Sequence, residues 1–421
     1  MTSQPMVASS LPSDWFQAAL QDVLVTLPSG GKVQQGWSPQ CEKGPAGASE
    51  WGVLKTTSVQ PGRFEDCHNK RLPSSLAPRP ALEVQSGDLL LTNAGPRSRC
   101  AVPCLVRATR PRLLLSGKHY RFRTDEAIMD PRFLEYLLLA PNTQLHLDRM
   151  KTGISDSGLN LTRQRFLDLP VVVAPMTEQR RIVDVLEGQL SRLDAAEAAL
   201  RTASMRLGSL ERTTLSSAYR QGGLHDLGSI ASMQGGIQKQ PKRAPASNAY
   251  PFLRVANVTK HGLDLAEVHR VELFGSELER LRLEPGDLLV VEGNGSASQI
   301  GRAAVWTGAI ENCVHQNHLI RVRPAPGLHP DFLEAVWNSP QHRAVLSEVA
   351  SSTSGLHTLS VAKLKQLRIP LPAWDSQVAT VEAVTALRTS RKRLDDQLAQ
   401  ASQRAAALRR SLLAAAFSGQ L

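Results

Sequence analysis

The chain has 421 residues, enough for two or three domains that each bury a core. Its 42% hydrophobic and 21% charged residues are typical of a folded globular protein, and 49 Lys and Arg against 38 Asp and Glu give a formal charge of +11. This excess favours a polyanionic partner, either nucleic acid or an anionic membrane surface, and charge alone does not separate the two.

No segment predicts a membrane span or a secretory signal. The longest apolar run, residues 134–140, is too short to cross a bilayer, and the N-terminus lacks a basic region followed by an apolar one. The five cysteines lack the spacing of a disulfide framework. Reduced thiols are favoured over a zinc site made by Cys67-His68 with Cys100-x-x-x-Cys104, because that spacing matches no common zinc pattern. We therefore expect a cytoplasmic protein that binds no membrane.

Residues 1–174 predict a first mixed α/β domain. Short β-rich runs such as GDLLLT, residues 87–92, are bounded by glycine, proline and asparagine. The segment DPRFLEYLLLA, residues 130–140, predicts a helix, with Pro131 at a position that helix starts prefer.

Residues 175–222 predict one long helix, which starts at PMTEQRRIVDVLEGQL and extends from about Glu178 to Tyr219. Ordinary globular helices are shorter, so this length indicates a coiled coil. An apolar seam repeats every seven residues at Leu186, Leu193, Leu200 and Leu207, with a companion seam at Gln189, Ala196, Ala203 and Leu210.

The second half of the chain repeats the first at a step of 197 to 199 residues. GDLLL at Gly87 returns as GDLLV at Gly286, PRFLEY at Pro131 returns as PDFLEA at Pro330, and other weak pairs keep the same order. This period is far longer than that of solenoid repeats and indicates a duplicated domain. We therefore predict a second mixed domain at 223–371.

Residues 372–421 predict the second long helix, from about Asp375 to Phe417. A step of 198 places its seams at Val384, Arg391, Leu398 and Ala405, and at Leu387, Leu394, Ala401 and Leu408. The predicted fold class is α+β, with two mixed domains separated by two long antiparallel helices that form a coiled coil. The alternative is two amphipathic helices, each packed on its own domain. The leucines predicted to pair the helices are Leu186, Leu193, Leu200, Leu207, Leu387, Leu394, Leu398 and Leu408.

An ordered set of segments resembles the specificity subunits of type I restriction-modification systems. These segments are LPSDW near the start, APMTEQRRIVDVLEGQL at the first long helix, GDLLVVEGNGSASQIGRAAVW and HQNHLIRVRP in the second domain, and LRRSLLAAAFSGQL at the end. The resemblance covers nearly the whole chain, including its length and its duplicated order.

The resemblance implies a non-catalytic subunit that recognises double-stranded DNA. Each domain would bind one half of a split sequence, and the paired helices would set the spacing and dock two methyltransferase (modification) subunits. Restriction subunits would join the larger complex. S-adenosylmethionine would be bound by the partner methyltransferase, and this chain would bind no cofactor or metal.

The sequence departs from the family pattern at the second helix. DSQ, residues 375–377, replaces the TEQ of the first helix, and VVVAPM before the first helix lacks the first proline of IPLPAW. Docking at the second helix is therefore the weaker of the two docking expectations.

Basic and amide side chains outside the long helices are the candidates for DNA contact. The first helix has seven basic and six acidic residues and the second has seven and four, so most of the excess charge lies elsewhere. Lys and Arg can hold phosphates, whereas Gln, Asn and Arg can read base edges. For any single residue a solvated surface loop is the alternative. The candidates are Lys32, Gln34, Gln35, Lys55, Asn93, Arg97, Arg99, Gln238, Lys239, Lys242, Arg243, Arg254, Asn294, Ser296, Gln299, Arg302, Gln316, Asn317 and His318.

Two other functional classes are weighed against DNA recognition. A stand-alone DNA-modifying enzyme is disfavoured because EGNGS, residues 292–296, belongs to no phosphate or dinucleotide loop, and no methyltransferase tetrapeptide or nuclease carboxylate pair is present. His315 and His318 have spacing that suits a metal or an acid/base pair, but without a nearby ligand we favour a structural or DNA-facing role. The other class is a coiled-coil scaffold that binds only proteins, for which the net charge of +11 would have no functional role.

Overall fold

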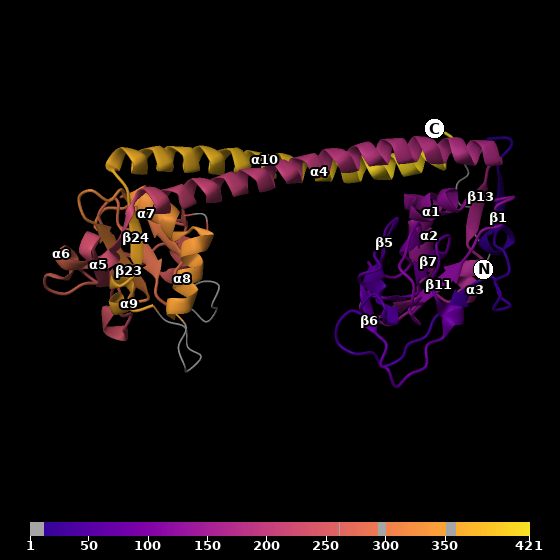
Figure 1. The fold of residues 1–421 in the computed structure, drawn as a ribbon, viewed down its shortest axis with the longest axis horizontal. Helices are drawn as coiled ribbons and strands as arrows, with labels where there is room; N and C mark the ends of the chain where they lie inside the picture. Colours follow the sequence, from indigo (N-terminus) through magenta and orange to yellow (C-terminus); the bar gives the residue numbers. More distant parts are fainter. Residues whose placement is uncertain (1–11, 261, 294–299, 351–358) are drawn as a thin grey trace. The chain divides into compact units, whose positions relative to one another are not determined.

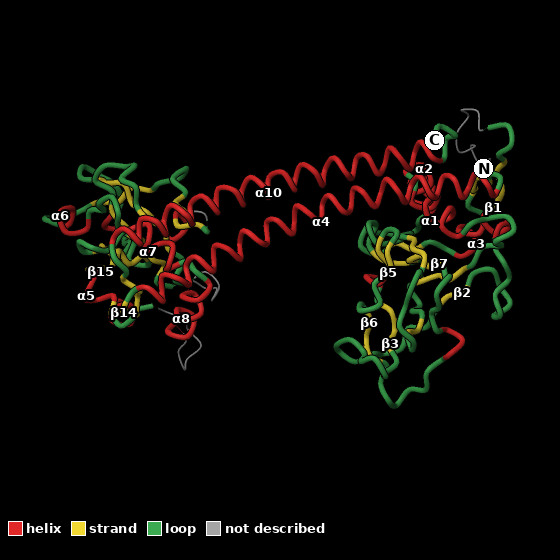
Figure 2. The backbone as a smooth tube through the Cα atoms, turned by 45° about the horizontal axis from the view of Figure 1, so that its top comes forward, coloured by secondary structure: helices red, strands yellow, loops and turns green. Residues whose placement is uncertain are grey.

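A computed structural model describes residues 12–260, 262–293, 300–350 and 359–421. The chain divides into two units, one formed by Met1–Ala198 with Ala399–Leu421 and the other by Ala199–Leu398. Each unit contains a mixed α/β region together with part of each long helix (Figures 1 and 2). The predicted domain limits at 174, 222 and 371 stay a prediction.

The mixed region of the first unit contains two main sheets. The four-stranded antiparallel sheet has the order β2 (Gln34–Gln35), β11 (His119–Phe122), β7 (Leu89–Thr92), β9 (Pro103–Leu105). The three-stranded sheet has the order β10 (Leu113–Leu114), β3 (Gly52–Leu54), β6 (Asn69–Arg71). Three antiparallel pairs complete the strands: β1 (Phe16–Ala19) with β13 (Pro170–Val173), β12 (Leu159–Asn160) with β8 (Ala94–Gly95), and β4 (Val59–Gln60) with β5 (Arg63–Phe64).

Short helices cover the sheets of the first unit. They are η1 (Leu20–Val23), η2 (Thr56–Ser58), η3 (Pro80–Leu82), α1 (Pro131–Leu139), α2 (Pro141–Met150) and α3 (Arg163–Leu167). Helix α1 confirms the predicted start at Pro131, because the Asp130 side chain caps it by accepting from the backbone N–H of Arg132 at 2.8 Å.

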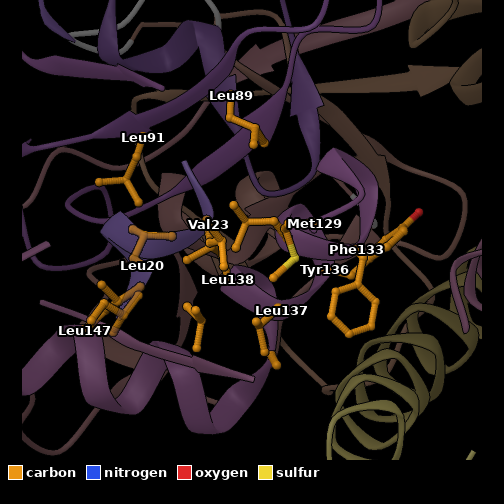
Figure 3. Close-up of a cluster of buried hydrophobic side chains, with 14 of the residues drawn as sticks. Leu20, Val23, Leu89, Leu91, Met129, Phe133, Tyr136, Leu137, Leu138 and Leu147 are labelled. Atoms are coloured by element: carbon orange, nitrogen blue, oxygen red, sulfur yellow. The ribbon is translucent and has the colours of Figure 1, made fainter. Parts of the chain in front are cut away.

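The core of the first unit lies where α1 packs against the four-stranded sheet. Figure 3 shows Leu137 and Leu138 of α1 facing Leu20 and Val23, with Leu89 and Leu91 of the sheet nearby. The same cluster includes Leu186 of the first long helix and Ala416 of the second. Apolar burial therefore attaches both long helices to this region.

The mixed region of the second unit has the same topology. Its four-stranded antiparallel sheet has the order β15 (Ala231–Gly235), β23 (Leu319–Pro324), β20 (Leu288–Val291), β21 (Ala303–Val305). Its three-stranded sheet has the order β19 (His269–Glu272), β16 (Ala249–Leu253), β22 (Val314–His315). Two antiparallel pairs are β14 (Gly223–Asp226) with β24 (Arg368–Leu371), and β17 (Val258–Thr259) with β18 (Gly262–Leu263). The helices are α5 (Leu227–Ile230), η4 (Pro241–Arg243), η5 (Val255–Asn257), α6 (Glu277–Leu281), α7 (Pro330–Trp337), α8 (Pro340–Ala350) and α9 (Val361–Lys365).

Matching strand registers support the duplication inferred from the sequence. Arg121 lies opposite Gln34 in the first unit, and Arg321 lies opposite Gln234 in the second. In each region one central strand also has a parallel neighbour, β3 with β10 and β16 with β22. The two halves of the chain thus form the same arrangement of sheets.

The two long helices are α4 (Met176–Gln221) and α10 (Trp374–Ala416), within two residues of the predicted limits at both ends. None of the described helices is long and apolar enough to cross a membrane. The predicted fold class, mixed helix and strand with two long helices, is confirmed.

Within each unit the two long helices run in opposite directions. In the first unit Arg409 of α10 contacts Asp194 of α4. In the second unit Arg388 contacts Glu211 at 2.7 Å, and Ser204 donates to Asp395 at 2.6 Å. Since higher numbers on α4 meet lower numbers on α10, the segments are antiparallel and paired, which excludes helices packed separately.

The first predicted seam of α4 is buried or half-buried at each leucine, but the companion seam differs from the prediction. Leu210 is 53% exposed, and Gln189 and Ala196 are exposed as well. A companion row that is buried or half-buried throughout lies one residue later, at Leu190, Glu197, Ser204 and Glu211. Polar pairing across the helices explains the shift, because Ser204 and Glu211 bond to α10.

On α10 the predicted Leu387, Leu394 and Leu398 are half-buried, whereas Leu408 is 47% exposed. The seam there includes Arg409 instead, whose guanidinium pairs with an aspartate of α4.

Candidate nucleic-acid interface

Each mixed region buries one aspartate at the start of a central strand. Asp88 precedes β7 and accepts from Arg123 Nε at 2.7 Å, and Asp287 precedes β20 and accepts from Arg323 Nε at 2.6 Å. A buried carboxylate needs such a partner, because an unpaired buried charge is strongly destabilising. The arginine and aspartate therefore join two strands of the sheet in each half.

The backbone conformation before each aspartate explains why both copies of the motif GDLL begin with glycine. Gly87 and Gly286 have φ of +88° and +95°. This left-handed conformation favours glycine, which has no Cβ.

Another glycine allows two loops to meet in each region. A Cβ on Gly36 would lie 2.1 Å from the carbonyl oxygen of Leu115, and one on Gly236 would lie 2.1 Å from that of His315. Only glycine fits these close approaches of backbone to backbone.

In the second region this approach brings two predicted DNA-contact segments together, residues 238–243 and residues 316–318. The backbone N–H of Ile237 donates to the His315 carbonyl oxygen at 2.8 Å, and that of Asn317 donates to the Ile237 carbonyl oxygen at 2.9 Å. Segments far apart in the sequence thus form one surface.

Four predicted contact residues of the first region are buried or bonded inside it. Lys32 donates from Nζ to two backbone carbonyl oxygens, and Arg99 donates to two more and to a glutamine side chain. Gln34 accepts from Arg121, and Asn93 is buried. These carbonyl groups compete with a phosphate for the two cations, and DNA contact by the four residues stays a prediction.

The remaining candidates of the first region are accessible, but one of them is neutralised. Arg97 pairs with Asp148 at 2.6 Å and with Asp156 at 3.0 Å. Gln35 is exposed although its Nε2 donates to a backbone carbonyl, and Lys55 is exposed. Among the predicted cations here, Lys55 is the one best placed for a phosphate.

Three predicted arginines of the second region have partners inside it. Arg243 pairs with Glu277 at 2.8 Å, and Arg254 pairs with Glu267 at 3.2 Å. Arg302 donates to a backbone carbonyl at 3.5 Å, and burial lowers the pKa of its guanidinium. Their charges are therefore compensated or partly buried.

The two meeting segments of the second region keep accessible polar side chains. Gln238, Lys239, Lys242 and His318 are exposed, and Gln316 and Asn317 are half-buried. The remaining candidates Asn294, Ser296 and Gln299 lie outside the described residues.

The two histidines, for which the sequence favours a structural or DNA-facing role, differ in burial. His315 is buried, its Nε2 lies 3.4 Å from the Gln234 carbonyl oxygen, and burial lowers its pKa to about 4, whereas His318 is exposed. Among the described residues no three His, Cys, Asp or Glu side chains gather in a way that could hold a metal. The five cysteines are unbridged.

A cavity of about 520 Å³ beside the 238–245 loop was not foreseen from the sequence. Its lining includes Lys239, Gln240, Arg243, Phe252, His269 and Arg270. Arg270 and His269 lie on β19, and the alternating run HRVE does indicate a strand. That this strand pairs with β16 beside the loop depends on contacts distant in sequence.

Comparison with known proteins places the chain beside one group of relatives. No protein-family model matches the chain. It is 25% identical over 393 residues to the type I restriction enzyme EcoKI specificity subunit of Escherichia coli (strain K12), covering 88% of this chain and 82% of that protein. It is 24% identical over 387 residues to the StySPI specificity subunit of Salmonella potsdam, with the same coverage.

The EcoEI specificity subunit of Escherichia coli is 31% identical over 194 residues, but this match spans 46% of the chain and only 32% of that protein. The resemblance to type I specificity subunits is confirmed.

Solved structures related to specificity subunits share the fold. The HsdS subunit from Thermoanaerobacter tengcongensis has a TM-score of 0.53 at 17% identity, covering 98% of this chain and 99% of its own. A structure described as the structural basis underlying complex assembly and conformational transition of the type I R-M system has a TM-score of 0.64 at 19% identity, covering 98% and 100%.

The departure from the specificity-subunit pattern at DSQ falls mostly on accessible positions. Thr177 and Asp375 are both exposed, whereas the shared Gln179 and Gln377 are buried at the starts of α4 and α10. These substitutions therefore leave the packing at the start of α10 unchanged.

Proposed function

We propose that the chain is the DNA sequence-recognition subunit of a type I restriction-modification complex and carries no catalytic site of its own. Each mixed region binds one half of a bipartite duplex target. The long helices set the spacing between the half-sites and dock two methyltransferase subunits, and restriction subunits join the larger complex. The methyltransferase binds S-adenosylmethionine, and the assembly acts on DNA in the cytoplasm.

The observation that carries this proposal is the duplication of one region with the same internal contacts. The buried aspartate and arginine pair, the close glycine and the order of strands occur twice. Two similar readers in one chain match two half-sites on a duplex, as two-fold related readers do in dimeric DNA-binding proteins.

Continuity of the helices supports the spacer role. α4 and α10 each contribute residues to both units. A helix has a fixed rise per residue, so a change of its length would change the distance that it sets.

The test is methylome sequencing of cells that express the chain together with the methyltransferase encoded beside it. The expected result is a methylated motif of two short sequences separated by unspecified bases, absent when either protein is omitted. Methyl transfer by the purified chain alone would support a stand-alone enzyme instead. Negligible DNA affinity in the presence of the methyltransferase would support a protein-binding scaffold.

A further inference from the structure

The cavity beside the 238–245 loop is built before any ligand arrives. Glu272 accepts from the backbone N–H groups of Ala246 and Asn248 at 2.8 Å, and Glu277 holds both terminal nitrogens of Arg243 at 2.8 Å. These bonds hold the end of the loop that forms one wall, and the Ile237 backbone N–H, which donates to the His315 carbonyl oxygen at 2.8 Å, holds its start. A preformed cavity loses little entropy on binding.

Two cations that line this cavity keep their charge available. Lys239 lies on the loop and is exposed, and Arg270 lies on β19 and is exposed. Arg270 donates to the backbone carbonyl of Ala249 at 2.5 Å and pairs with no carboxylate of the described residues. The guanidinium is thus oriented but not neutralised.

In the first region, the arginine at the strand position that matches Arg270 has its charge neutralised by carboxylates. Arg71 on β6 lies opposite Gly52 on β3 in the first region, and Arg270 on β19 lies opposite Pro251 on β16 in the second region. Arg71, however, is held by Glu42 at 3.5 Å and by Glu50 at 3.0 Å. The same strand position is therefore compensated in one half and cationic in the other.

We propose that this cavity holds a backbone phosphate of the bound DNA strand between Lys239 and Arg270. This inference rests on the proposed function. The two cations suit a phosphodiester, Arg243 with its carboxylate partner forms a fixed wall, and the volume leaves room for an adjoining sugar. Phosphate contacts fix the register of a protein on duplex DNA without reading its sequence.

The experiment measures how salt weakens binding of the full-length chain, copurified with its methyltransferase, to a labelled mixed-sequence duplex. Each phosphate contact contributes about 0.9 to the slope of log K against log salt concentration. Lys239→Gln combined with Arg270→Gln removes this one phosphate contact, so it is expected to reduce the slope by about 0.9 and to weaken specific and non-specific duplexes alike.

Two further variants distinguish loss of the phosphate contact from poor folding and from the general loss of a positive charge. Lys239→Gln alone, on an exposed loop, should lower the slope by part of this 0.9 even if the double variant folds poorly. Lys365→Gln removes an exposed lysine of α9, which contacts β15 and α5 rather than the cavity strands, and should leave the slope unchanged.

A salt-dependent wild type whose slope persists in both cavity variants overturns this inference and leaves the proposed function standing. A wild-type complex without salt-dependent duplex binding overturns both. Binding of a labelled mononucleotide that the double variant loses, with an unchanged duplex slope, overturns the inference in favour of a free nucleotide.

Discussion

Two buried glutamines show how single residues fix the long helices. Gln179 Oε1 accepts from the Asp130 backbone N–H at 2.9 Å, and its Nε2 donates to two backbone carbonyls at 2.8 Å. Gln377 makes the same three bonds, accepting from the His329 backbone N–H at 2.8 Å. The sequence predicts that these residues correspond, but their role depends on backbone groups about fifty positions away, which no local pattern reveals.

Gln377→Ala is expected to lower the free energy of unfolding by about 2–4 kcal/mol, because it leaves three buried backbone groups without partners. Gln189→Ala, an exposed site on α4, is the matched control and should stay within about 0.5 kcal/mol of wild type. Calorimetric unfolding of both variants measures the difference. Equal stability of the two variants would contradict the structural role of Gln377.

Buried histidines predict a loss of stability on mild acidification. Burial lowers the pKa of His315 to about 4, whereas an unfolded histidine titrates near 6.5. Between these values the unfolded chain binds the proton more readily, so this contribution is complete above about pH 6.5 and declines toward pH 4. His342 has the same lowered pKa, about 4, for the same reason.

His315→Gln should therefore reduce the dependence of the unfolding free energy on pH by up to about 1.4 kcal/mol per pH unit in this window. Urea unfolding at several pH values between about 7 and 5 measures the slope. An identical slope in the variant would show that folding does not lower the pKa of His315.

At the level of elements, the long helices show what heptad reading finds and what it misses. The row from Leu186 to Leu207 is buried or half-buried, as leucine at a seven-residue spacing predicts. The second row was assigned one residue early, since Glu197, Ser204 and Glu211 fill it and polar residues are not expected in a seam. Their partners lie on α10, roughly 180 to 215 positions later in the sequence.

The two glycines of α4 predict unequal gains in stability from an added methyl group. A Cβ on Gly188 would meet no atom within 4 Å, so Gly188→Ala should raise the free energy of unfolding by about 1 kcal/mol through helix propensity. A Cβ on Gly208 would lie 3.2 Å from Arg391 Nη1, so Gly208→Ala should gain less. Thermal unfolding of the pair compares them, and a larger gain at Gly208 would contradict the described packing.

For the whole molecule, the order of the elements and the duplication were predictable, whereas the free charges were not. Repeated letters such as GDLL mark the same turn twice, and the resemblance to specificity subunits extends over both halves. Whether a given lysine or arginine is free depends on distant carbonyl and carboxylate groups. Lys32 and Arg99 therefore serve the fold, and Arg270 was missed although it lines a cavity.

The central claim is that each mixed region reads its own half of one DNA target. Exchanging residues 223–371 for the matching segment of a related specificity subunit and sequencing the methylome tests it most directly. The account predicts a motif in which one half changes while the other half is retained. A motif that changes in both halves, or in neither, would contradict it.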